Sequence, residues 1–350
     1  MIVALVQFQR SFSCRPMQHI EDFIREFEKS SSFIEVQTSG STGAPKRMFV
    51  EKSRMINSAK RTLSVLGLQP GSVALVCLPT QYIAGKMMIV RALVGGMRIE
   101  SVSPQANPLL GFDESRLSEQ TLLAITPHQL TEILNNEESR RVLEKLSHVI
   151  VGGGAIPESV EQIAMSLPES VKIFATYGMT ETLSHVALRR INGIQRQLEF
   201  TPLYGVTLST DAENCLILTD DLTSPNPLIT NDIVEILPNG NFRVLGRRDN
   251  VIISGGVKLQ IEAIENQLSD SLPVKLLLTY VNDAHFGQAL TMLYEGEVSV
   301  EALRQSCVNV VSRYEVPKHF FQVDQLPLTE TGKPARGKAH ELAESLLQII

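Results

Sequence analysis

The chain of 350 residues has 43% hydrophobic side chains and a formal net charge of −6 at pH 7. This composition supplies a core for one large and one small domain, and the lack of a basic stripe argues against nucleic acid as a partner. The four cysteines lie far apart and form no C-x-x-C pair, which indicates neither a zinc site nor a disulfide framework. Because no apolar run approaches the ~20 residues of a membrane span, we expect a cytoplasmic protein that does not insert into membranes.

The first informative stretch is QTSGSTGAPKRM, residues 37–48. It lies between FIEV (33–36) and RMFVE (47–51), which both have the composition of strands, so we expect a loop that joins the two strands of a hairpin. Pro45 stands where a Walker A loop needs its second glycine, and a Walker loop would run from a strand into a helix. The commonest phosphate-binding motif is therefore excluded.

The composition of this loop still favours a polyanion as its ligand. Gly40 and Gly43 let the backbone approach a ligand closely, and Lys46 adds a compact positive charge that suits phosphate. Hydroxyl donors come from four further residues: Thr38, Ser39, Ser41 and Thr42. The alternative is an ordinary surface turn, because clusters of Gly, Ser and Thr are usually turns.

Helical and extended patterns alternate from residue 53 to residue 178. Apolar spacing and end signals predict helices at 53–67, 83–96, 128–136 and 157–167. Strands are predicted at 72–78, 97–102, 121–126, 148–153 and 171–178. Such alternation is typical of an α/β fold with a doubly wound sheet. Ligands of such folds bind at the carboxyl ends of the strands, where Gly152–Gly154, Tyr177 and Gly178 stand.

The pattern changes after about residue 202. Short strands separated by turn residues continue to about residue 245, and Asn239-Gly240 is a strong hairpin signal. The chain beyond GRRD (246–249) predicts a compact α+β unit with a helix after Gly256, a strand at 275–281, a helix at 301–313 and a strand near 319–323. We therefore predict an N-terminal domain at 1–248, in which 202–248 form a β-rich subdomain, and a mobile C-terminal domain at 249–350.

Four motifs follow one another along the chain: TSGSTGAPK (38–46), YGMTE (177–181), TND (230–232) with GRRD (246–249), and TGK (331–333). Together they resemble the motifs of the adenylate-forming superfamily, which includes acyl-CoA synthetases, luciferases and peptide-synthetase adenylation domains. The resemblance runs from about residue 33 to 340 and implies the adenylate-forming enzyme fold, with a shortened N-terminus because only 37 residues precede Thr38. Within the superfamily, the chain looks most like the o-succinylbenzoate–CoA ligases of menaquinone biosynthesis, because of TPHQL (126–130), VGGGAIP (151–157) and YGMTET (177–182).

The resemblance implies a nucleotide site. The β- and γ-phosphates of ATP would be held by the loop residues Thr38, Ser39, Gly40, Ser41, Thr42, Gly43 and Lys46. Adenine would lie on a wall of three residues without side chains: Gly152, Gly153 and Gly154. Tyr177, followed by Gly178, would stack on the base. Asp232 would accept hydrogen bonds from the ribose hydroxyls, and Arg247 would donate to them.

The resemblance also implies the catalytic groups. Thr180 would touch the α-phosphate, Glu181 would bind Mg²⁺, and Lys333 would span the substrate carboxylate and the α-phosphate. Asp249 would be the hinge about which the C-terminal domain rotates between two reaction steps. The thiol, expected to be coenzyme A, would reach the site past Ser254, Gly255 and Gly256.

The implied reaction has two steps. A carboxylate attacks the α-phosphate of MgATP to give acyl-AMP and pyrophosphate, and coenzyme A then displaces AMP to form a thioester. We expect o-succinylbenzoate as the substrate, whose second carboxylate requires a pocket arginine or serine that the sequence does not identify. The alternatives are another aryl- or acyl-CoA ligase, acting on a different small carboxylate, and a non-catalytic nucleotide-binding relative. The sequence indicates no oligomeric state.

Several of these residues also have a plainer interpretation. GRRD could be a solvated charge cluster, and Lys333 could belong to a basic tail. His128 and His185 could face the acyl substrate, but histidines at a helix end or in a core are the favoured interpretation. Three positions depart from the superfamily pattern: Asn231 replaces glycine, Val257 replaces an acidic residue and Ile261 replaces proline.

Overall fold

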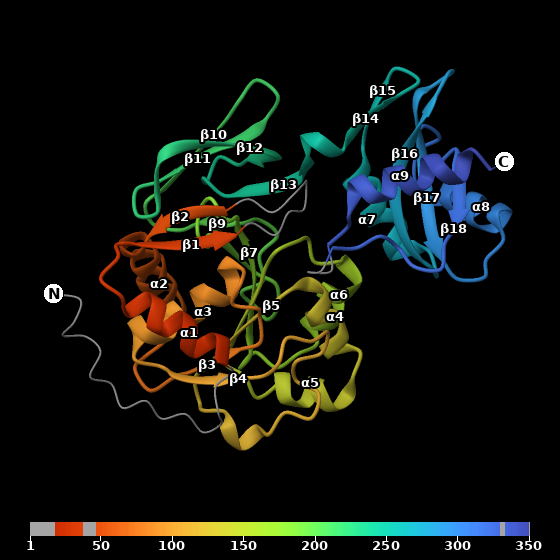
Figure 1. Cartoon of the computed structure of the whole chain (residues 1–350). Coiled ribbons are helices and arrows are strands. Elements are labelled where there is room, and N and C mark those ends of the chain that lie inside the picture. Colours follow the sequence, from red (N-terminus) through yellow and green to blue (C-terminus); the bar gives the residue numbers. More distant parts are fainter. Residues whose placement is uncertain (1–17, 38–46, 330–332, 350) are drawn as a thin grey trace.

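The computed structural model describes residues 18–37, 47–329 and 333–349 (Figure 1). The strands of its largest sheet are β3 Val73–Val76, β4 Arg98–Ser101, β5 Thr121–Ile125, β6 His148–Val151, β7 Lys172–Gly178, β8 His185–Arg190 and β9 Thr201–Pro202. They are ordered β4-β3-β5-β6-β7-β8-β9. The strands from β4 to β7 in this order are parallel, whereas β8 and β9 pair antiparallel.

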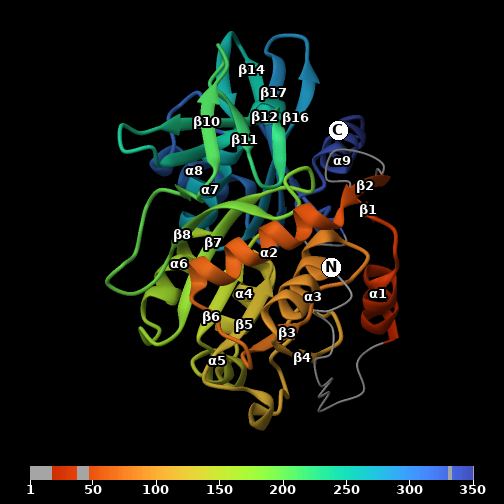
Figure 2. The ribbon, with the colours of Figure 1, turned by 90° about the vertical axis from the view of Figure 1, so that its left-hand side faces the viewer.

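Neighbouring residues of a strand point to opposite sides of the sheet. Because both sides carry apolar side chains, helices pack against both faces. Ala74 and Val76 pack on the side that is covered by α1 (Gln18–Glu28), α2 (Lys52–Leu66) and α3 (Ile83–Gly95). Leu75 packs on the side that is covered by α4 (Pro127–Leu134), α5 (Glu137–Leu143) and α6 (Glu158–Met165). In Figure 2, α2 crosses in front of the sheet. The predicted doubly wound α/β sheet is confirmed.

Local signals explain several of these helix ends. Gly67 ends α2 in the left-handed region with a φ of 68°. Thr126 begins α4 through a capping box: its side chain accepts from the Gln129 N–H, and the Gln129 side chain accepts from the Thr126 N–H. The helix α5 was not predicted, because the asparagines after α4 indicated only a stop, yet Asn136 caps α5 by accepting from the Ser139 N–H. Neither α1 nor β8 was predicted.

Two smaller antiparallel sheets adjoin the large one. The hairpin β1 (Phe33–Gln37) and β2 (Arg47–Glu51) pairs from Phe33 opposite Glu51 to Gln37 opposite Arg47, as predicted. The second sheet contains β10 (Val206–Thr210), β11 (Cys215–Asp220), β12 (Ser224–Ile236) and β13 (Phe242–Arg247) in that order. Ile236 pairs with Phe242 and Gly240 has a φ of 83°, so the hairpin predicted at Asn239-Gly240 is confirmed.

The C-terminal part follows a 3-10 turn, η3 (Arg248–Asn250), and has its own apolar clusters. Its strands are β14 Val251–Ser254, β15 Val257–Gln260, β16 Lys275–Asp283, β17 Gly287–Glu295 and β18 His319–Gln322. Its helices are α7 Ile261–Ser271, α8 Val300–Val310 and α9 Arg336–Leu347. The other 3-10 turn among the described elements, η2 (Glu114–Arg116), belongs to the large-sheet region and lies before β5. The helix predicted after Gly256 is α7, which begins at Ile261, and the strand β15 that precedes it was not predicted. Within the described ranges, no helix is long and apolar enough to cross a membrane.

Candidate active site

The glycines that follow β6 lie at the carboxyl edge of the large sheet, beside the end of β7. A Cβ added to Gly152 would lie 2.3 Å from Thr176 Oγ1, so the backbone approaches β7 as closely as only glycine allows. Gly153 and Gly154 are exposed, and Gly153 has a φ of 94°. All three glycines thus lie at the carboxyl end of β6, as predicted from the sequence. Their contact with adenine stays a prediction.

Lys333 reaches this edge from the C-terminal part. A Cβ built on Gly153 would lie 3.5 Å from Lys333 Cε and 3.8 Å from its Nζ. The backbone of Lys333 is fixed by Thr329, whose side chain accepts from the Lys333 N–H at 3.1 Å and whose N–H donates to the Lys333 carbonyl at 2.8 Å. Burial lowers the pKa of Lys333, and the positive charge of Arg247 lowers this pKa further. A lysine of a solvated tail would not be placed in this way, so that alternative is disfavoured.

The segment after β7 forms a tight turn that only its particular residues permit. A Cβ on Gly178 would lie 2.3 Å from the Ser184 carbonyl oxygen, so glycine is required there. Thr182 is fully buried, and its hydroxyl accepts from the Met179 N–H at 2.9 Å. Leu183 has a φ of 64°, a strained conformation for a residue with a side chain. Strain of this kind is typical of functional turns.

The tip of this turn carries Thr180, which is half-buried, and Glu181, which is exposed. Within the described ranges, no group of three or more His, Cys, Asp or Glu residues could hold a metal ion. Mg²⁺ is usually held by one or two carboxylates together with substrate phosphates, and Glu181 supplies one carboxylate. The roles of both residues stay predictions.

Asp232 joins the predicted adenine and ribose residues into one cluster. Its carboxylate accepts from the Tyr177 hydroxyl at 2.6 Å and from Arg247 at 2.9 Å, and only 8% of the residue is exposed. The Tyr177 ring also packs edge-on against Phe242, with 5.2 Å between the ring centroids. Two segments that are 55 residues apart in the chain therefore form one side of the candidate site.

Asp249 lies in η3, between the large part of the molecule and the C-terminal part. Its carboxylate accepts from Arg247 at 2.9 Å, and each of its oxygens accepts from Asn231 Nδ2 at 3.0 Å. Asn231 in turn accepts from Arg248 at 2.7 Å. The GRRD segment is thus tied to β12 by side chains, and the hinge role of Asp249 stays a prediction.

Ser254, Gly255 and Gly256 form the turn of the β14–β15 hairpin. Gly255 and Gly256 have φ values of 58° and 82°, and the Gly255 N–H donates to the Phe286 carbonyl at 2.8 Å. Figure 1 shows this hairpin at the top of the C-terminal part, away from the α6 end of the large sheet that Lys333 approaches. The described residues thus place Lys333 beside Gly153, and Tyr177 and Arg247 beside Asp232, whereas the predicted thiol-tunnel turn lies away from them.

The sequence did not single out Arg91, which lies on α3 and is only 2% exposed. Its guanidinium donates to Ser184 Oγ; among the described residues its Nε has no hydrogen-bond partner and no carboxylate forms an ion pair with it. Burial lowers the pKa of Arg91 to about 10, which leaves it charged at neutral pH. His185 lies beside it, with Nε2 3.1 Å from Thr62 Oγ1. A lone arginine in the apolar stretch MMIVRALV is the signal that could have identified this group.

The loop residues predicted to hold phosphates lie outside the described residues: Thr38, Ser39, Gly40, Ser41, Thr42, Gly43 and Lys46. Gln37, the last described residue before this segment, pairs with Tyr82 directly before α3. The described chain before the segment therefore ends next to the helix that carries Arg91.

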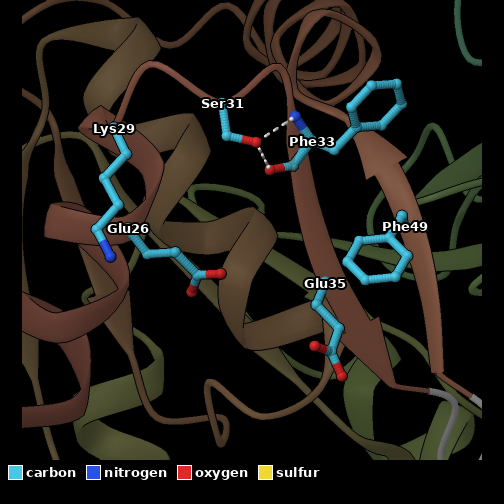
Figure 3. Close-up of a pocket in the computed structure, with 6 residues that line it drawn as sticks. All are labelled: Glu26, Lys29, Ser31, Phe33, Glu35 and Phe49. Carbon is cyan, nitrogen blue, oxygen red and sulfur yellow. Dashed lines mark hydrogen bonds between the residues drawn. The ribbon is translucent and has the colours of Figure 1, made fainter.

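A separate pocket opens between α1 and the β1–β2 hairpin, with a volume of about 540 Å³ (Figure 3). It is lined by Glu26, Lys29, Ser31, Phe33, Glu35 and Phe49. The Ser31 hydroxyl donates to the Phe33 carbonyl and accepts from the Phe33 N–H, so it closes a local turn. None of the lining residues belongs to the predicted site, and we assign the pocket no role in the reaction.

Comparison with known proteins decides the family. The family described as "AMP-binding enzyme" matches residues 34–223, which is more than half of the chain. The chain belongs to the AMP-binding enzyme family. It is 24% identical to a 2-succinylbenzoate–CoA ligase from Bacillus cereus, over 92% of this chain and 72% of that protein. It is 25% identical to the protein of the same name from Bacillus mycoides, over 93% of this chain and 73% of that protein.

Solved structures of similar proteins also resemble this chain. An acyl-CoA synthetase (AMP-forming)/AMP-acid ligase II-like protein from Dyadobacter fermentans is 32% identical, with a TM-score of 0.61 over 93% of this chain and 95% of that chain. The o-succinylbenzoate coenzyme A synthetase from Bacillus subtilis, in complex with ATP and magnesium ion, has a TM-score of 0.72 at 20% identity, over 87% of this chain and 69% of that chain. The predicted superfamily, its fold and the enzyme class, an AMP-forming acyl-CoA synthetase, are confirmed.

Proposed function

We propose that the enzyme is a carboxylate–CoA ligase that converts o-succinylbenzoate, ATP and coenzyme A to o-succinylbenzoyl-CoA in menaquinone biosynthesis. The names of the Bacillus relatives support this substrate. The observation that carries the proposal is the buried guanidinium of Arg91, which has no carboxylate partner among the described residues. Such a group suits o-succinylbenzoate, because this acid keeps one free carboxylate while the other reacts.

Arg91 is a buried cation for which the described residues supply no carboxylate partner. An isolated charge costs several kcal/mol to bury, so buried cations normally face a carboxylate or another anion. Arg91 is bonded to Ser184, which belongs to the same turn as Thr180 and Glu181. An acid held by Arg91 would thus lie beside the predicted α-phosphate residues. Arginine and serine are the two residue types of which at least one is expected to bind the second carboxylate.

In the first step, the chain places its charges around the reacting atoms. Lys333 supplies a positive charge at the glycine edge, where a negative charge grows as the carboxylate attacks the α-phosphate. Asp232 and Arg247 supply an acceptor and donors for the ribose hydroxyls, and Tyr177 borders the base. No side chain acts as a nucleophile, and catalysis consists of placement and charge stabilisation.

The residues present fit the metal that such a reaction uses. Glu181 is exposed, and the described residues around it form no acidic cluster, which suits Mg²⁺ that arrives with ATP. When bound, the ion would neutralise charge on the phosphates.

In the second step, coenzyme A must reach the acyl-AMP. Lys333 occupies the glycine edge here, and the Ser254 to Gly256 turn lies elsewhere. We infer that the domain at 249–350 rotates about Asp249 relative to 1–248 so that this turn can face the site.

The substrate is tested with Arg91→Met and two acids: o-succinylbenzoate and 4-oxo-4-phenylbutanoate, which lacks the ring carboxylate. The wild type should form the adenylate with the first acid far more efficiently, and Arg91→Met should lose most of this preference while its KM for ATP is unchanged. Arg141→Met, which changes an exposed arginine, is the control. A wild type that does not distinguish the two acids would refute the proposed substrate.

A further inference from the structure

Arg91 stands at one end of a chain of buried and partly buried hydrogen bonds that connects three elements. Its guanidinium donates to Ser184 Oγ, and Ser184 Oγ lies 3.4 Å from His185 Nδ1. The other ring nitrogen of His185 lies 3.1 Å from Thr62 Oγ1, and Thr62 is bonded to the Ser58 carbonyl at 3.0 Å. The residues come from α2, α3 and the turn that leads into β8.

The direction of each bond in this chain can be worked out from the donors. The Thr62 hydroxyl gives its single hydrogen to the Ser58 carbonyl, so the Thr62 oxygen must accept from His185 Nε2–H. In a neutral ring, His185 Nδ1 is then an acceptor. Ser184 accepts from Arg91, and its own hydrogen is left for Nδ1. The neutral Nε2–H tautomer of His185 satisfies Thr62, Ser184 and both ring nitrogens.

The surroundings favour the same state. His185 is 5% exposed, and burial lowers its pKa well below the ordinary value, with the positive charges of Arg91 and Arg61 acting in the same direction. Arg61 is already neutralised by Asp220, but Arg91 has no carboxylate partner among the described residues. A protonated His185 would add a further buried positive charge next to Arg91.

We propose that His185, as a neutral Nε2–H imidazole, is a positioning residue that fixes Ser184 and thereby aims Arg91 at the free carboxylate of the acyl substrate. This inference rests on the proposed function, because it assumes that Arg91 binds a dicarboxylate. His185 does not touch the reacting atoms. It sets the enzyme's preference for a dicarboxylate by restricting the orientation of the guanidinium.

Two substitutions separate this role from a merely structural one. His185→Leu removes both polar contacts, whereas the amide of His185→Asn keeps an acceptor close to the Nδ1 position. The preference is measured as the ratio of kcat/KM in adenylate formation for o-succinylbenzoate and 4-oxo-4-phenylbutanoate. We expect it to fall about tenfold or more in His185→Leu, as when a hydrogen bond to a charged group is lost, and to recover largely in His185→Asn. The KM for ATP and the activity of His285→Leu, an exposed control, should not change.

An equal loss with both acids, or an unchanged ratio in His185→Leu, would overturn the inference. A wild type without any preference would instead refute the proposed substrate. The tautomer is tested separately by ¹⁵N NMR of the intact protein, in which the His185 signals are assigned among the seven histidines by their absence in His185→Asn. A neutral Nε2–H form from about pH 6 to 8 is expected, and an Nδ1–H or doubly protonated ring would contradict the proposal even if His185→Leu did not fold.

Discussion

The Tyr177 hydroxyl donates a 2.6 Å hydrogen bond to the carboxylate of Asp232. Burial raises the pKa of Tyr177 far above its ordinary value, and the negative charge of Asp232 raises it further. The phenol therefore keeps its proton and remains a donor. The second oxygen of the same carboxylate accepts from Arg247. The orientation of Asp232, the predicted ribose acceptor, is therefore set by Tyr177, which is predicted to stack on the base.

Tyr177→Phe should weaken nucleotide binding without abolishing the reaction. The ring remains, but Asp232 loses one donor, which costs about 0.5–1.5 kcal/mol and corresponds to a roughly 2- to 12-fold higher KM for ATP. The KM for the carboxylate should stay constant. Steady-state kinetics check this, with Tyr280→Phe in the C-terminal part as the control. A change confined to the KM for the carboxylate would show that Tyr177 acts on the acyl substrate and not on the nucleotide.

Lys333→Ala should slow acyl-AMP formation by roughly 10²–10³-fold, about 3–4 kcal/mol, because a fixed charge-stabilising donor is lost. Transfer from supplied acyl-AMP to coenzyme A should survive. Single-turnover measurements of each half-reaction decide this, with Lys338→Ala on the exposed side of α9 as the control. An equal fall in both half-reactions of folded protein would show that Lys333 has no separate role in the first step.

The pH dependence of adenylate formation should follow the ammonium of Lys333. The group is charged below its pKa, and this pKa lies below the usual 10.5 of a lysine. The rate should therefore fall as pH rises, in a range below that of an ordinary lysine. Lys333→Arg keeps its charge to higher pH, so whatever activity remains should lose this alkaline decline. The same decline in Lys333→Arg would assign the titration to another group.

Asp249→Pro should retain carboxylate-dependent pyrophosphate exchange and lose most thioester formation. Asp249 lies in a 3-10 turn, whose φ is close to the value that proline imposes, so the observed arrangement is compatible with proline and rotation is not. Asp249→Ala removes the bonds to Asn231 and Arg247 without fixing φ, which separates the two effects. Unimpaired thioester transfer in the proline variant would refute the hinge assignment.

Arg61 and Asp220 form a buried bidentate ion pair between α2 and β11, with both bonds at 2.8 Å. Asp220→Asn should lower the free energy of unfolding by about 3–5 kcal/mol, because Arg61 is left buried without its charge partner. Glu235→Gln, which breaks an exposed pair with Arg243, should cost less than about 1 kcal/mol. Urea unfolding followed by far-ultraviolet circular dichroism is suitable, since the chain has no tryptophan. Equal effects of the two substitutions would contradict this account.

The same pair predicts how stability depends on pH. Burial alone raises the pKa of Asp220, but the hydrogen bonds from Arg61 and Thr223 outweigh it and lower the pKa overall. The stabilisation is thus present above the ordinary aspartate pKa and is lost as pH falls through the lowered value. The gap between wild type and Asp220→Asn should shrink only in that acidic range, and a gap that is constant down to the acid transition would contradict the shift.

Much of the fold could be predicted because its signals are local. Helix α2, for example, has an apolar stripe and a glycine stop, and Gly178 lies in a motif. Other elements lack such signals: β17 is buried on both faces and shows no alternation, and α9 has no capping side chain. The hairpin turn at Gly255-Gly256 was not predicted from the two glycines, which have positive φ and lie between β14 and β15.

Apart from His185, the proposed acyl side of the site could not be predicted, for a different reason. Arg91, Thr62 and His185 come from three elements, and none of them belongs to a motif. Their meaning depends on burial and on the absence of a described carboxylate partner for Arg91, which only the folded chain reveals. The link between Tyr177 and Asp232 is likewise a product of the fold.

The most direct test of the account is ATP–pyrophosphate exchange by the wild type with a panel of acids, followed by addition of coenzyme A. We predict strong exchange with o-succinylbenzoate, weak exchange with 4-oxo-4-phenylbutanoate and benzoate, and release of o-succinylbenzoyl-CoA and AMP once coenzyme A is present. Preferential exchange with another acid would keep the ligase and refute the substrate. Exchange with none of the acids, by protein that is shown to bind ATP, would contradict the central claim and leave a nucleotide-binding protein without this activity.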